Sequence, residues 1–145
     1  MSEAISYNQV RYAVHDALGT AFPGIPVSDE ELPQGVDPPR FFVRLLEPGH
    51  VRELGRRFRR RHPFAIRYFA AAPMNDDLYD MAEQLMQAVA WIELEGRPLP
   101  GLDMRFQIEN GVLEFWVAYE MLVWEQPIAV PKMQTLEQEG KIVEA

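Results

Sequence analysis

The sequence predicts an α+β fold in which two helices, each able to cover one face, pack on a mostly antiparallel sheet in the order helix, strands, helix, β-hairpin. Three observations favour this class. Two segments repeat apolar residues at helical spacing, shorter segments are strongly apolar or alternate with polar residues, and Asn110-Gly111 marks a tight hairpin turn. The chain has 145 residues, enough to bury a core without cross-links. We expect one domain over residues 1–126 and an extended C-terminal tail over residues 127–145.

The first helix is predicted over residues 6–21. Ser6 and Gln9 have capping-box spacing, so the Ser6 hydroxyl can accept the backbone N–H of Gln9. Apolar residues then recur at helical spacing, at Val10, Ala13, Val14, Ala17, Leu18, Ala21 and Phe22. Pro23-Gly24 ends the element.

Strands and turns are predicted between the helices. Residues 24–39 indicate a short strand near 25–28, followed by an acidic, proline-rich loop. Apolar runs predict strands over 40–47 and 64–69, with the arginine-rich segment between them.

The second helix is predicted from a cap at Asn75 to a stop just before Gly96. Its first turn carries acidic residues, where the helix dipole favours negative charge. Its apolar stripe is Leu78, Met81, Ala82, Leu85, Val89 and Ile92.

The turn at Asn110-Gly111 sets the register of the final hairpin. That register pairs Glu109 with Val112, Ile108 with Leu113, Phe106 with Phe115 and Met104 with Val117. On the opposite face, Arg105 beside Trp116 predicts a cation–π pair. The second strand continues to about residue 125 with both faces apolar, about twice the usual strand length. We expect Leu122 and Trp124 on this extension to be buried against another chain or against the tail.

Positive charge is concentrated in one segment. Of fourteen Lys and Arg residues, seven lie between Arg52 and Arg67, interrupted only by Glu53, in a chain of net charge −8. Such a split is typical of a protein that repels copies of itself over most of its surface and attracts an acidic partner at one place.

Three interpretations of this cluster stay open. It can dock an acidic protein surface through Arg–carboxylate bonds, grip a nucleic-acid backbone, or form a solvated loop. A pI near 4.9 disfavours nucleic acid, because the rest of the surface repels phosphate. The predicted interface arginines are Arg56, Arg57, Arg59, Arg60 and Arg61. Their predicted acidic partners are Asp29, Glu30, Glu31, Asp76 and Asp77.

Catalytic chemistry is not indicated anywhere in the sequence. His15, His50 and His62 lack neighbouring ligands at metal spacing, and no phosphate loop or nucleophile motif occurs. Neither a secretory signal nor a membrane-spanning run is predicted. We expect no catalytic, cofactor-binding or metal-binding residue.

Taken in order, the elements resemble the tail-terminator (tail-completion) proteins of long-tailed bacteriophages. The resemblance covers about residues 5–126. It rests on the runs PRFFVRLL (39–46), GRRFRRRHPFAIRYF (55–69), LYDMAEQL (78–85) and IENGVLEF (108–115).

The resemblance implies a structural virion protein without enzymatic activity or cofactor. It implies a homohexameric ring that caps the head-proximal end of the tail tube, stops tube growth and provides the head-attachment surface. The implied neighbours are the tail tube protein and a head-completion or connector protein. DNA would cross the lumen without specific binding, and no membrane is involved. The implied location is the neck of the tail, after assembly in the host cytoplasm. Two alternatives remain: a head-completion or connector protein of the neck, and a small nucleic-acid-binding module using residues 56–61.

Overall fold

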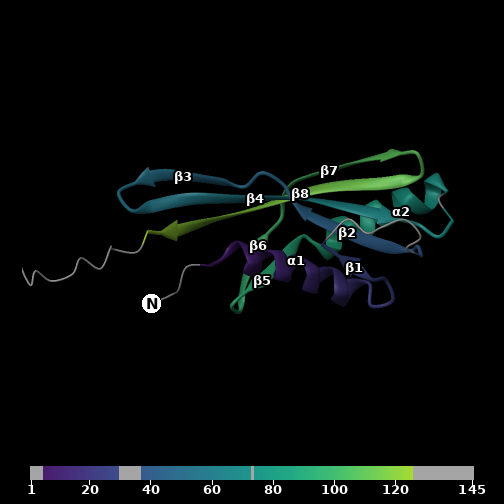
Figure 1. Ribbon diagram of the computed structural model, residues 1–145, viewed down its shortest axis with the longest axis horizontal. Coiled ribbons are helices and arrows are strands. Elements are labelled where there is room, and N and C mark those ends of the chain that lie inside the picture. The colour runs from purple at the N-terminus through teal and green to yellow at the C-terminus, as the bar shows by residue number, and fades with distance from the viewer. Residues whose placement is uncertain (1–4, 30–36, 73, 126–145) are drawn as a thin grey trace, which may run out of the picture.

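The computed structural model describes residues 5–29, 37–72 and 74–125 (Figure 1). Its helices are α1 (Tyr7–Ala21) and α2 (Asn75–Ala88). Its strands are β1 (Val27–Ser28), β2 (Arg40–Leu45), β3 (Gly49–Leu54), β4 (Arg57–Phe69), β5 (Trp91–Leu94), β6 (Arg97–Pro100), β7 (Leu102–Glu109) and β8 (Val112–Trp124). The predicted α+β class is confirmed. Glu30, Glu31 and the tail predicted over 127–145 lie outside the described residues.

Two long strands organise the main sheet, whose order is β1-β2-β4-β8-β7 with β3 also paired to β4. All of these pairs are antiparallel except β1–β2. β4 and β8 pair with each other over their full length of 13 residues. β2 and β7 flank only one half of this pair, and β3 flanks only the other half.

The sheet is therefore divided into a body and an arm. We define the arm as β3, the turn at residues 55–56, residues 57–61 of β4 and residues 120–124 of β8. Figure 1 shows the arm extending away from the helices, to the left of the molecule. The body contains the other halves of β4 and β8 together with β1, β2 and β7.

Both helices lie on the same face of the body. One core cluster contains Val14 of α1 and Leu85 of α2 together with Phe64 of β4 and Phe115 of β8. Phe64 and Phe115 point to one side of the sheet, so the two helices share that side. Neither helix covers the opposite face, whereas the sequence suggested helices able to cover one face each.

The helix predictions are confirmed for α1 and partly wrong for α2. Ser6 Oγ accepts the N–H of Gln9 at 3.1 Å, and the Ser6 N–H donates to Oε1 of Gln9 at 2.8 Å, as the capping box predicted. The N-cap of α2 is Met74 rather than Asn75. The helix ends at Ala88, and Ile92 belongs to β5.

The reason for this early end is a turn that the helical spacing concealed. Glu95 and Gly96 both have positive φ, at 52° and 79°, and connect β5 to β6 as a tight hairpin. Ile92 and Leu94 are buried from alternate positions of a strand, but Ile92 also lies three residues after Val89, a spacing that fits a helical stripe equally well.

The final hairpin has the predicted register near its turn. Ile108 pairs with Leu113 and Phe106 with Phe115. The predicted pair of Met104 with Val117 is wrong, because the register shifts between Leu102 and Arg105. Asp103 lies in this bulge with a φ of 56°.

Candidate functional site

The arginine-rich segment forms the start of β4 and is not a loop. Phe64 and Ile66 are buried under the helices, so alternation puts Phe58, Arg60 and His62 on that same side. Arg57, Arg59 and Arg61 consequently lie on the helix-free side. Phe58, His62 and Phe64 occupy even-numbered positions, and this period of two is a sequence signal for a strand. The high density of arginines in the segment masked that signal.

Arginines on the helix-free face of the arm form a ladder of ion pairs with acidic residues of the same chain. Arg59 Nε lies 2.5 Å from a carboxylate oxygen of Glu53, which raises the pKa of Arg59. Arg61 reaches Glu120 at 2.9 Å and Asp103 at 2.7 Å. These acids come from β3, β8 and β7, so the charges of Arg59 and Arg61 are compensated within the chain.

Arginines on the other face pack on aromatic rings. The guanidinium of Arg60 lies 4.6 Å from the ring centre of Tyr7, and its Nη1 donates to the carbonyl of Ile5 at 2.9 Å. Arg52 lies 4.5 Å from the ring centre of Phe58, on which His50 also stacks at 4.2 Å. Most of the cluster thus stabilises the arm itself.

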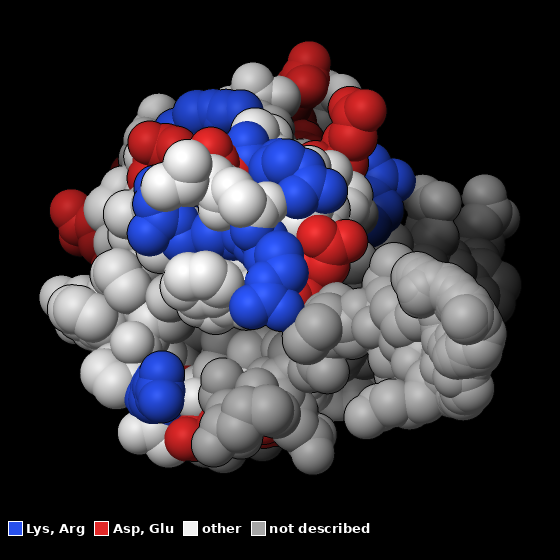
Figure 2. All heavy atoms as spheres, turned by 90° about the vertical axis from the view of Figure 1, so that its left-hand side faces the viewer, with Lys and Arg blue, Asp and Glu red and all other residues white. Residues whose placement is uncertain are grey.

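Exposed apolar side chains are the second property of the arm. Val51, Leu54, Leu122 and Trp124 are 62%, 72%, 46% and 62% exposed. Val51 and Leu122 flank Arg59 in one row across the helix-free face, and Trp124 pairs with Arg57 in the next row. Figure 2 looks at this end of the molecule and shows basic and acidic side chains interleaved with other surface. Such exposed apolar groups between charges are typical of an interaction surface.

Arg56 differs from its neighbours. It lies in the turn between β3 and β4, and within the described part of the chain its side chain forms no hydrogen bond or ion pair. Its charge is free to meet a partner.

The predicted acidic partners occupy different situations. Asp29 is bound to Arg11, so its charge is already compensated. Asp76 and Asp77 are exposed in the first turn of α2 and form no ion pair with any described residue. α2 lies at the end of the molecule opposite the arm (Figure 1).

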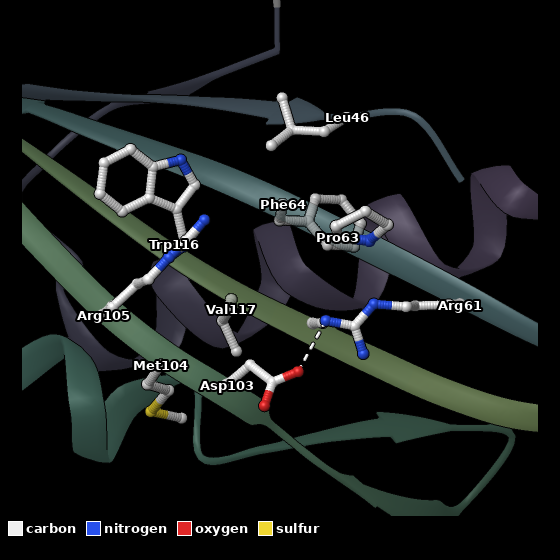
Figure 3. Close-up of a pocket in the computed structure, with 10 residues that line it drawn as sticks. Leu46, Arg61, Pro63, Phe64, Asp103, Met104, Arg105, Trp116 and Val117 are labelled. Carbon is white, nitrogen blue, oxygen red and sulfur yellow. Dashed lines mark hydrogen bonds and ion pairs between the residues drawn. The ribbon is translucent and has the colours of Figure 1, made fainter. Parts of the chain in front are cut away.

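A shallow trough of about 460 Å³ lies on the helix-free face where the arm meets the body (Figure 3). Pro63, Val117 and Ala118 contribute to its lining, with Arg61 and Asp103 on one side and Arg105 and Trp116 on the other. Arg105 lies 4.6 Å from the Trp116 ring centre, which confirms the predicted cation–π pair. The trough continues the exposed surface of the arm into the body.

The histidines of the described residues are not gathered at a metal-binding cluster. Among these residues, no cluster of three His, Cys, Asp or Glu side chains is placed to hold a metal ion. His62 is fully buried beside the Tyr7 ring, and burial lowers its pKa to about 4. Neither described helix is long and apolar enough to cross a membrane.

Comparisons with known proteins identify one matching family model and several similar folds. A family model described as phage tail terminator protein matches residues 9–131. The chain is similar in fold to the sheath/tube terminator of an extracellular contractile injection system, PVC, in its extended state. That match has a TM-score of 0.52 and 12% identity, over 90% of this chain and 63% of that chain. A chain from the virion of a native gene transfer agent particle matches with a TM-score of 0.48 and 16% identity, over 79% of this chain and 96% of that chain. No curated protein sequence matches.

Proposed function

Because the chain belongs to the phage tail terminator family, we propose that it caps the head-proximal end of a tail tube as a closed homohexameric ring. In this role it stops growth of the tube and provides the surface for head attachment. The tube protein lies on one side of the ring and a head-completion or connector protein on the other. The role is structural, in the neck of the virion, and DNA crosses the lumen without specific binding.

The arm is the observation that carries this proposal. It projects from the folded body, and its apolar side chains Val51, Leu54, Leu122 and Trp124 are between 46% and 72% exposed. Nothing in the folding of the monomer requires such side chains there, whereas assembly does. An arm at one end and a different surface elsewhere favour a heterologous contact, the type that closes a ring.

The charged residues of the arm have a second part in this proposal. Arg56, Arg57, Arg59, Arg60 and Arg61 meet acidic groups on a neighbouring copy or tail protein, from the turn and from both faces of the arm. Arg56 is the strongest candidate, since the others already have partners within the chain. Among the predicted acidic partners, Asp76 and Asp77 form no ion pair with any described residue, whereas Asp29 is bound to Arg11.

The test is Trp124→Ala combined with Leu122→Ser in a phage that lacks the functional gene. Both side chains are exposed, so we expect the purified variant to unfold within about 0.5 kcal/mol of wild type. Electron microscopy should show overlong tubes or tails without heads. Tyr12→Ala is a matched control, because Tyr12 is 58% exposed on α1, away from the arm. Normal tails joined to heads in the arm variant would refute this use of the arm.

A further inference from the structure

The arm has two unpaired edges. β3 pairs only with β4 among the described strands, so one of its edges is free. β7 pairs with β8 only as far as Ala118, so residues 120–124 of β8 also have a free edge within the described chain. Both edges have similar length, since β3 and β8 flank the same segment of β4. Unpaired edges of this kind are templates for pairing with another strand.

The register identifies the backbone groups that point outward. The N–H of Leu46 donates to the carbonyl of Pro63 at 2.8 Å, so odd-numbered residues of β4 direct their backbone groups toward β2 and β3. The carbonyl of Arg56, which accepts the N–H of Glu125, points the other way, toward β8. Alternation then leaves the backbone groups of His50 and Arg52 on the free edge of β3. On β8 it leaves those of Glu120, Leu122 and Trp124.

These two edges lack the protection that another edge of the molecule has. β6 carries Pro98 and Pro100, which lack N–H groups and discourage strand addition. β3 and the end of β8 contain no proline. Each carries two exposed apolar residues instead: Val51 and Leu54 on β3, and Leu122 and Trp124 on β8.

We propose that β3 of one copy pairs with residues 120–124 of β8 in the next copy, so that the arms form one continuous sheet around the ring. This inference rests on the proposed function, and it names the atoms of the ring contact. β3 and β8 both run antiparallel to β4, so they run in the same direction and the new pair is parallel. Neighbouring arms then point in the same direction, and the same contact repeats from copy to copy until the ring closes.

The two different edges of neighbouring copies fit each other better than either alternative, which is the segment that follows β8 or an identical edge of a second copy. Strands in a sheet lie about 4.8 Å apart, so the apolar pair on β3 would lie directly beside the apolar pair on the neighbouring β8. Both pairs are then covered at once. The segment that follows β8 in the same chain contains Pro127 and Pro131, which disfavours it as an added strand. Pairing of two identical edges would be antiparallel and would stop at a dimer.

Disulfide trapping in assembled tails tests the pairing directly, because the chain has no cysteine of its own. Val51→Cys is combined in turn with Glu120→Cys, Leu122→Cys and Trp124→Cys, which cover the registers on one face. Val51 and Leu122 of the same arm are two strand spacings apart, about 10 Å, which exceeds the reach of a disulfide. Any bond in that double variant therefore joins two copies.

We expect at least one double variant to give a ladder of covalent oligomers, ending at a closed ring, on non-reducing gels of oxidised tails. The single variants Val51→Cys and Leu122→Cys should remain monomeric on the same gels. Dimers from a single variant would show pairing of identical edges and overturn the proposal. Tails that contain the protein but give no bond in any double variant would overturn the pairing and leave the proposed function intact. Absence of the wild-type protein from purified tails would overturn both.

Leu122→Pro provides an independent test that needs no cross-link. It removes an outward N–H that the arm itself does not use, a position where an edge strand accepts proline. The purified variant should keep the far-ultraviolet circular dichroism of wild type and fail to form rings on tails. Met121→Pro is the matched contrast, because the N–H of Met121 points to β4 and its loss should unfold the arm. Normal rings from Leu122→Pro would overturn the pairing.

Discussion

The arm and the body are built from the same two strands but are stabilised in different ways. In the body, β4 and β8 bury Phe64, Ile66 and Phe115 against two helices. In the arm, the same strands are held by ion pairs and by arginines packed on aromatic rings, while Leu122 and Trp124 stay exposed. The hydrophobic core therefore lies in the body, whereas the arm leaves apolar side chains exposed for a contact outside the monomer.

The largest expected effect compares two aromatic residues of β8. Phe115→Ala removes a fully buried ring and should lower the free energy of unfolding by about 3–5 kcal/mol. Trp124→Ala removes a larger ring that is 62% exposed and should change it by less than about 0.5 kcal/mol. Urea unfolding of the purified variants measures both. Equal losses would show that the arm is part of the folding core, and the distinction between the two regions would fail.

The next effect concerns His62, which lies where the arm joins the body. Its pKa is lowered to about 4 from 6.5 because burial disfavours the charged ring. The unfolded chain takes up this proton below pH 6.5 and the folded chain does not, so stability should fall as the pH drops from 6.5 toward 4. The expected loss is about 3 kcal/mol. It should be measurable as a lower urea midpoint, and His62→Phe should be less sensitive over that window. An identical pH profile in the variant would contradict the burial of this ring.

The smallest effect on stability separates two arginines of the arm. Arg59→Glu places a third carboxylate beside Glu53 and Glu120, so it should lower the urea midpoint, less so at high salt. Arg56→Glu removes a charge without a partner in the described chain and should leave the midpoint unchanged. In complementation assays, Arg56→Glu should nevertheless reduce tail completion. If Arg56→Glu completes tails as well as wild type, the free charge of the arm has no role in assembly.

Local patterns predicted several parts of the molecule well. The capping box of Ser6 and Gln9, the turn at Asn110-Gly111 and the pairing of Phe106 with Phe115 all depend on residues close in sequence. Backbone periodicity and turn chemistry act over such short distances, so the residues themselves specify the element. The same patterns, in their order along the chain, supported the resemblance to tail terminators that the family match confirms.

Predictions from local patterns were wrong where one spacing of apolar residues fits both a helix and a strand. Ile92 fits the stripe of a helix and the buried face of a short strand, and only the positive φ of Glu95 and Gly96 decides between them. The run of arginines before His62 concealed a strand in the same way.

By itself, then, the sequence determined the α+β class, the first helix, the final hairpin register near its turn and the family. The tertiary structure decided the charge and exposure of the predicted site. Glu120 lies 59 positions from Arg61 along the chain, yet the register of β8 on β4 brings their side chains within 2.9 Å. The same register leaves Leu122 and Trp124 beyond the helices, where they are exposed. Contacts between distant strands depend on the packing of the whole sheet, which no short segment of sequence specifies.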